Sequence, residues 1–276
     1  MIQRLMLTNS RVRLQSGLEA FGRVPRSAKM TGSLFAGFAM WEIVGQLTSP
    51  LILATFSDSV IAFVKAVSTG ELIRHTVISF TELAIGFVIG FVVGLAGGVL
   101  SAVNRTFRDM TDPWIAIKYT TPTIALIPLL VVWLGFGMPA VIALVFLAVF
   151  VPIWLNTYIG VTSTDPHLLE VMRTFGASRL QVLRWVILPW ALPSLIVGIR
   201  LAFSRGFVAV IVGEFIGSTA GLGYFISVAA GFYQTEKIMA GVMVLAGITI
   251  IMVEMLKWMQ RVMVPWWETR ESDDSL

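Results

Sequence analysis

Long apolar runs dominate the pattern of this 276-residue chain. A membrane-spanning helix needs about 20 apolar residues in succession. Leu83 to Val103 is a charge-free run of that length, and no Asp, Glu, Lys or Arg occurs from Tyr119 to Thr164. Gly135, Gly137 and Pro139 interrupt the second run, so it predicts two spans.

Three further runs are apolar but contain charges or are shorter. They are Gly32 to Leu47, which contains Glu42, Leu192 to Val212, which contains Arg200 and Arg205, and Ile238 to Val253. The chain is therefore expected to be an all-α polytopic membrane protein with about six transmembrane helices.

The basic residues follow this topology. If both termini are cytoplasmic, 15 of the 20 Lys and Arg residues lie in cytoplasmic segments, two lie in the fifth span, and only Lys65, Arg74 and Lys237 lie outside. Cytoplasmic loops of membrane proteins carry such an excess. The net charge of +4 thus reflects orientation in a plasma (inner) membrane, and no nucleic-acid partner is expected.

Composition restricts the chemistry further. Hydrophobic residues make up 57% of the chain and charged residues 13%, which a soluble domain rarely accommodates. The absence of Cys excludes disulfides and thiolate metal sites, and two His residues are too few for a metal cluster. No site for a metal or a cofactor is predicted in this chain.

The chain divides into four segments. Residues 1–31 form a basic cytoplasmic tail without a signal peptide, for which an interfacial helix and disorder remain alternatives. Residues 32–69 hold the first span and an external segment, residues 70–266 the main transmembrane domain, and residues 267–276 an acidic cytoplasmic tail.

Residues 165–189 predict a charged helix-turn-helix between two spans. Asp165 is a good N-cap before a helix from Pro166 to Phe175, and Gly176 suits the left-handed residue that ends it. Ser178 and Gln181 predict a capping box for a second helix, which Pro189 and Pro193 should limit to about Arg179 to Leu188.

The stretch from Glu170 to Pro189 resembles the cytoplasmic EAA loop of ATP-binding-cassette (ABC) importer permeases. Glu170, Gly176, Leu188 and Pro189 match that motif in register, whereas Val171 and Met172 replace its two alanines. Such loops dock into a groove of the ATPase subunit. The resemblance therefore assigns ATPase coupling to the following residues: Glu170, Val171, Met172, Phe175, Gly176, Ala177, Ser178 and Pro189.

Two other segments extend the resemblance to permeases that import nitrate, sulfonates and taurine. They are Thr121 to Gly137, read as TPTIALIPLLVVWLGFG, and Gly221-Leu222-Gly223-Tyr224. The resemblance implies a type I importer permease fold and a complex of two permease chains, expected to be identical, with two ATPase subunits and an external solute-binding protein. ATP and Mg²⁺ belong to the ATPase, since no Lys here follows the Gly that a Walker A loop requires.

Six residues are candidates for the pathway. Pro122 and Pro128 should kink or interrupt the third span, either to line a pathway or as a packing kink. Arg200 and Arg205 are intramembrane charges and thus functional candidates, although Arg200 also suits a structural pair. Glu214 matches an acidic residue of the family and suits an outer gate or a helix-end hydrogen bond.

Glu82 and Arg205 both depart from the family pattern, which commonly has Arg and an apolar residue at these positions. Counted along their helices, both should lie in the outer half of the bilayer. An ion pair between them is expected, with attraction of an anionic solute by Arg205 as the alternative.

The sequence thus predicts a non-catalytic permease subunit that passes a small, anionic solute. A secondary transporter and a non-transporting membrane scaffold remain alternatives, although the chain shows no evident internal repeat or central carboxylate relay.

Overall fold

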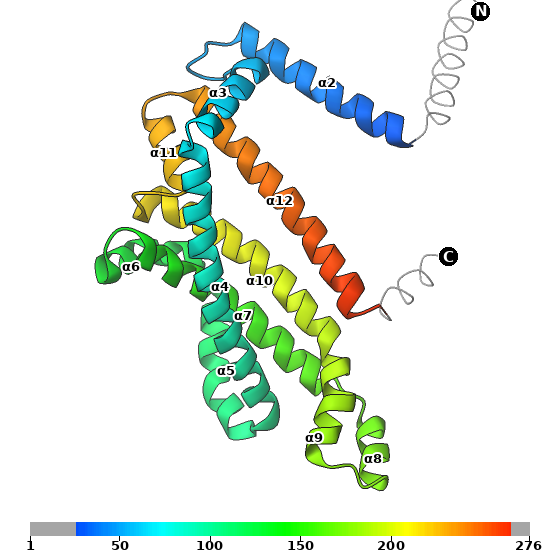
Figure 1. Ribbon diagram of the computed structural model, residues 1–276. Helices are drawn as coiled ribbons and strands as arrows, with labels where there is room; N and C mark the ends of the chain where they lie inside the picture. Colours follow the sequence, from blue (N-terminus) through cyan, green and yellow to red (C-terminus); the bar gives the residue numbers. More distant parts are fainter. Residues whose placement is uncertain (1–25, 266–276) are drawn as a thin grey trace, which may run out of the picture.

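A computed structural model describes residues 26–265, and every regular element within them is a helix (Figure 1). The expected acidic tail and most of the basic N-terminal tail lie outside the described residues. In chain order the elements are α2 (Arg26–Leu47), α3 (Phe56–Ser68), α4 (Glu71–Val103), α5 (Arg105–Thr120), η1 (Thr123–Leu126), α6 (Ile127–Leu134), α7 (Met138–Thr162), α8 (Pro166–Thr174), α9 (Arg179–Val182), η2 (Leu183–Ile187), α10 (Leu188–Gly217), α11 (Leu222–Gly231) and α12 (Thr235–Met263).

The described residues contain four helices that are long and apolar enough to cross a membrane. They are α4, α7, the continuous helix Arg179–Gly217 and α12. A fifth candidate is the pair formed by α5 and the segment Thr123–Leu134, which meet at a bend of 94°. The expected third span is therefore broken, as Pro122 indicated.

The first expected span is the exception. Gly32 to Leu47 is helical within α2, but α2 is not among the helices apolar enough to qualify. Its 22 residues include Arg26, Lys29 and Glu42 together with several small polar residues, which lower its mean hydropathy. By length and composition the described chain thus holds four spans, or five with the bent pair, rather than six.

Glycines allow α4 and α7 to pack closely side by side. Gly86 faces Val145, Gly90 faces Val149 and Gly94 faces Ile153, so the two helices run parallel. α10 runs in the opposite direction, because its Gly198 faces Asn156 and its Gly213 faces Leu144. Small residues permit such close approach between apolar helices. These three helices form the centre of the fold.

The second helix of the 165–189 segment does not stop where the prolines were expected to end it. It continues from α9 through the π-helical turn η2 into α10, so Pro189 and Pro193 lie inside one continuous helix. In η2 the Leu188 N–H bonds to the Leu183 carbonyl, five residues back. A π turn at this point re-registers the hydrogen bonds beside the missing N–H of Pro189.

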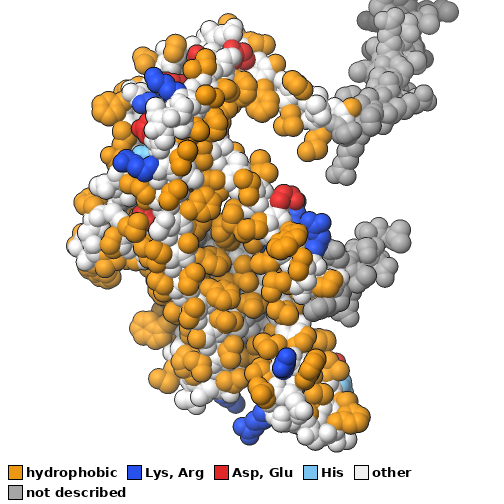
Figure 2. Space-filling view, in the orientation of Figure 1, with side chains coloured by type: hydrophobic (Ala, Val, Ile, Leu, Met, Phe, Trp, Pro, Cys, Tyr) orange, Lys and Arg blue, Asp and Glu red, His pale blue; other side chains and the backbone are white. Residues whose placement is uncertain are grey.

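In the view of Figure 2 most charged side chains lie toward one end or the other, one further charged group lies at mid-height, and most of the remaining surface is apolar. One end carries α8 and α9, and the other carries α3 and the start of α12 (Figure 1). An apolar belt between two polar ends is the arrangement that a bilayer requires.

Candidate functional site

The hairpin of α8 and α9 is built as its sequence predicts. The Asp165 carboxylate accepts a hydrogen bond from the His167 N–H at 2.8 Å and caps α8. Gly176 has φ +69°, the left-handed conformation that ends the helix. The Ser178 hydroxyl accepts from the Gln181 N–H, and the Gln181 side chain accepts from the Ser178 N–H, which completes the capping box.

This hairpin exposes apolar side chains beyond the helical bundle. None of the residues of α8, α9 or η2 is buried. Phe175 is 83% exposed and Leu180 72%. Glu170 and Gly176 are exposed as well, whereas Met172, Ala177 and Pro189 are partly covered. An exposed apolar surface next to charges is typical of a protein interface.

A cavity of about 440 Å³ opens where the third span breaks. The break supplies Tyr119, Thr120, Thr121, Pro122, Thr123 and Ile124; α7 supplies Ala148, and α10 supplies Ser204, Arg205, Val208 and Ala209. Pro122 and Arg205 therefore lie at one site, although they are far apart in the sequence. Pro128 lies at the start of α6 instead, and Arg200 is exposed elsewhere on α10.

Two basic side chains approach this cavity. The Arg205 guanidinium lies over the Tyr119 ring, 5.2 Å from its centroid. Lys118, which the sequence had not singled out, donates a hydrogen bond to the Thr123 hydroxyl at 2.7 Å. Its position next to a Pro-broken span was the only signal for it in the sequence.

A buried polar cluster joins α4, α10 and the start of α11. The Glu214 carboxylate accepts hydrogen bonds from the Ser79 hydroxyl at 2.5 Å and from the Gly223 N–H at 2.6 Å. His75 accepts from the Gly221 N–H at 3.0 Å. Glu214 thus holds the N-terminus of α11, which is the helix-end role that the sequence offered for it. The sequence had not indicated Ser79 or His75, since only the fold brings them to Glu214.

Glu82 belongs to this cluster and does not pair with Arg205. It is completely buried, and its carboxyl lies next to the Glu214 carboxylate, close enough for the two groups to share a hydrogen bond. The expected ion pair is wrong because Arg205 does not lie on the face of α10 that packs against α4, the helix that carries Glu82. Gly206 faces α4, since a Cβ added there would lie 3.3 Å from the Leu83 Cδ1, and its neighbour Arg205 is rotated by about 100° around the helix.

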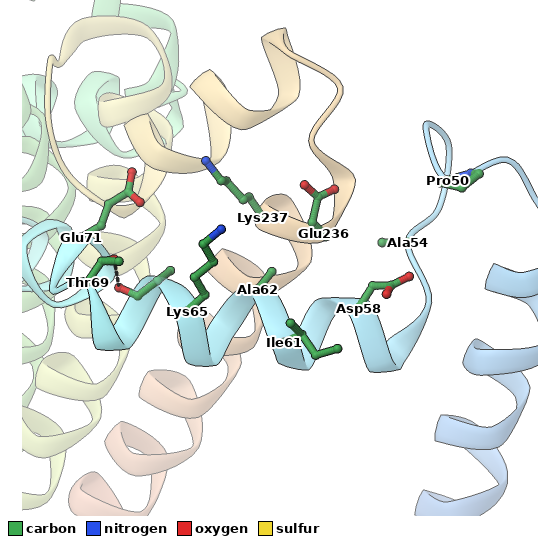
Figure 3. A pocket seen from close by; sticks show the side chains of 11 residues that line it. Pro50, Ala54, Asp58, Ile61, Ala62, Lys65, Thr69, Glu71, Glu236 and Lys237 are labelled. Atoms are coloured by element: carbon green, nitrogen blue, oxygen red, sulfur yellow. Dashed lines mark hydrogen bonds between the residues drawn. The ribbon is translucent and has the colours of Figure 1, made fainter.

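A second cavity of about 460 Å³ lies at the end of the molecule opposite the hairpin (Figure 3). It is bounded by α3, the loop before it, and the starts of α4 and α12. Its charged lining consists of Asp58, Lys65, Glu71, Glu236 and Lys237, and the two lysines come from facing helices. The site is a mixed-charge groove suited to a polar protein surface.

Together these features define a polytopic α-helical membrane protein with a protruding hairpin at one end, a broken span, and a charged groove at the other end. Residues 86–269 match the family described as binding-protein-dependent transport system inner membrane component. The chain belongs to this family.

Its relatives include transport permeases for sulfonates. The chain is 33% identical over 230 residues to the aliphatic sulfonates transport permease protein SsuC of Bacillus subtilis, covering 83% of each chain. It is 32% identical over 254 residues to the taurine transport system permease protein TauC of Escherichia coli, covering 88% of this chain and 92% of the relative.

Solved structures share the fold. An inward-facing form of the MetNI methionine ABC transporter matches 68% of this chain and 91% of its own, with TM-score 0.54 and 23% identity. An amino acid ABC transporter crystallised with histidines matches 72% of this chain and 97% of its own, with TM-score 0.56 and 17% identity.

These findings confirm the ABC importer permease fold and the non-catalytic role of the chain. It is a multi-pass inner membrane protein and the permease subunit of a binding-protein-dependent ABC importer, whose ATPase is a separate subunit. Such a system includes an ATPase and a solute-binding protein as partners. The secondary-transporter and scaffold alternatives are thereby set aside.

Proposed function

We propose that this chain, as a homodimer, forms the membrane pathway of an importer for a small sulfonate or related anion. Support for the solute class comes from the likeness to SsuC and TauC and from the basic residues at the broken span. The C-terminus is cytoplasmic in this proposal, because α12 starts at the α3 end and runs toward the hairpin side, where its last turns carry Lys257 and Arg261. A cytoplasmic N-terminus requires that α2 cross the membrane as well, since the five candidate spans among the described residues are an odd number.

The hairpin carries the coupling proposal. Glu170, Val171, Phe175 and their neighbours through Ser178 present the exposed surface to the ATPase, and Pro189 lies where the hairpin continues into the helix that borders the cavity. Since η2 joins α9 to α10 without a loop, movement of the hairpin is transmitted directly to α10. The groove of Figure 3 then faces the solute-binding protein on the other side.

The test is affinity purification of the tagged chain from its native membrane in mild detergent. We expect two ATPase copies with two permease chains. Phe175→Ala should lower ATPase recovery, because it removes an aromatic side chain that is 83% exposed in the permease alone.

Phe232→Ala is the matched control, since Phe232 is 72% exposed and directly follows α11, which lies away from the hairpin (Figure 1). It should leave ATPase recovery unchanged. A wild-type complex without any ATPase would refute the coupling proposal, and equal ATPase loss in the two variants would refute the role of the hairpin.

A further inference from the structure

Arg205 and Lys118 place positive charge at the broken span without a carboxylate to balance it. The ion pairs of the described residues join Arg105 or Arg108 to Asp109 and Lys257 to Glu254. None involves Arg205 or Lys118, and no Asp or Glu lines the cavity between them. Both side chains contact the break itself, since Arg205 lies over the Tyr119 ring and Lys118 bonds to the Thr123 hydroxyl.

The depth of this charge is unusual for a structural role. Arg205 lies near the middle of α10, and Ala148 on the opposite wall lies near the middle of α7. A basic side chain at this depth is costly to keep in an apolar environment. A charge that is retained there without a carboxylate partner indicates that something else balances it.

The backbone at the same place points to a polar cavity. The third span stops at Thr120, turns through Thr121 and Pro122, and resumes at a 94° angle. Irregular backbone at membrane depth is tolerated where it lines a water-filled cavity or is covered by protein, and broken helices of transporters form solute sites near the midplane.

The lining matches one chemical class of ligand. Thr120, Thr121, Thr123 and Ser204 line the cavity together with Arg205, and Ala148, Val208 and Ala209 supply apolar walls. A guanidinium and an ammonium suit a compact oxyanion with a short aliphatic part. The Thr120 and Thr121 hydroxyls donate to carbonyls of α5 and so hold the break in place. The volume of about 440 Å³ lies within the usual range for small-molecule sites.

We propose that this cavity is an anion site within the permease, which binds the sulfonate or a similar oxyanion of the solute during its passage. Arg205 and Lys118 supply the charge, and Thr123 orients the Lys118 ammonium. This inference rests on the proposed import of a small anion and adds a site of recognition in the permease itself.

The test measures equilibrium binding of radiolabelled taurine to the purified permease–ATPase complex in lipid nanodiscs, without the solute-binding protein. We expect saturable binding that methanesulfonate displaces and that dimethyl sulfone, its uncharged isostere, does not. Arg205→Gln and Lys118→Gln should each weaken binding by about tenfold or more, since each removes a charge-assisted contact. Arg205→Lys should retain part of the affinity.

Arg261→Gln is the matched control, because it removes one positive charge from the exposed last turn of α12, away from the cavity. It should bind taurine like the wild type. Basal ATP hydrolysis and the size of the complex show that each variant is assembled, and Lys118→Gln provides an independent reading if Arg205→Gln does not assemble.

Three results would overturn the site: no saturable binding to the assembled wild-type complex, equal displacement by dimethyl sulfone, or undiminished binding by an assembled Arg205→Gln, Lys118→Gln double variant. Measuring uptake into proteoliposomes with ATP and the solute-binding protein distinguishes failure of the anion site from failure of the proposed function. If the wild type imports taurine and the double variant imports it equally well, the anion site alone is refuted. If the wild-type complex imports no sulfonate, the proposed function is refuted.

Discussion

Gly94 sits at the tightest approach to backbone along the α4–α7 interface, and Gly94→Ala therefore tests the packing of the fold. A Cβ at this position would lie 2.5 Å from the Phe150 carbonyl oxygen and 2.8 Å from the Ile153 Cβ. Carbon–oxygen contacts are normally about 3.3 to 3.6 Å. The two helices must therefore move apart by roughly 1 Å, which loosens the contacts above and below.

Overpacking of this kind costs about 1–3 kcal/mol. The obstacle is backbone, which cannot rotate away as a side chain would, so we expect the upper part of that range. Thermal unfolding of the detergent-purified chain, followed by intrinsic Trp fluorescence, should show a Tm several degrees below that of the wild type.

Gly247→Ala is the matched control, because Gly247 lies inside α12 with no heavy atom within 4 Å of its Cβ position. Ala is favoured over Gly in a helix interior by about 1 kcal/mol, so this variant should unfold at the wild-type temperature or above it. If Gly94→Ala were as stable as Gly247→Ala, the close approach of α4 and α7 would be wrong.

Three further changes test the remaining sites. Gly221→Ala should destabilise the chain by roughly 1–3 kcal/mol, measured as a lower Tm, because Gly221 has φ +106° and a Cβ there would meet the Glu214 carboxyl at 2.2 Å; an unchanged Tm would contradict this packing. Glu82→Gln should raise the Tm or leave it unchanged, since a neutral amide of similar size keeps a donor toward Glu214 and removes one of two adjacent buried carboxyls. A marked loss of stability would show that the carboxyl of Glu82 is itself required. Ser178→Ala should cost about 1 kcal/mol of local helix stability and speed hydrogen exchange at the Gln181 amide; unchanged exchange would argue against the capping box.

The hairpin was predictable because its signals are local. An N-cap, a left-handed Gly and a capping box each act within about four residues, so reading them needs no knowledge of the fold. All three appear in the structure at Asp165, Gly176 and Ser178. The prediction that Pro189 ends the helix was wrong because it also rests on a local rule. The π turn before Pro189 shifts the hydrogen-bond register, so the helix continues although Pro189 has no N–H.

The spans were less predictable at their ends than in their middles. The apolar runs of α4, α7, α10 and α12 lie where expected, but α4, α10 and α12 extend beyond their runs. The angle of 94° at the broken span was not predictable, because Pro122 fixes where a helix stops and not the direction in which the chain resumes.

The predicted pairing of Glu82 with Arg205 was wrong because it required both the depth of each side chain in the membrane and the face of the helix on which it lies. Depth in the membrane could be counted along each helix, but a helix that is apolar on nearly all sides gives no hydrophobic stripe from which to assign its faces. Glu82 and Arg205 were therefore paired by charge and depth, although one lies against Glu214 and the other over Tyr119.

The spacing of the glycines indicates which face of each helix lies toward the interior of the bundle. Gly86, Gly90, Gly94 and Gly98 recur every four positions and mark the face of α4 that lies against α7. Glu82 is four residues before Gly86 and so continues this line toward the interior of the bundle. On α10, Gly198, Gly206 and Gly213 mark the inner face in the same way, which leaves Arg205 beside that face rather than on it. In a helix that is apolar on all sides, the row of glycines thus shows which face is buried. It distinguishes Glu82, a buried carboxyl in line with that row, from Arg205, a cation beside it that borders a cavity.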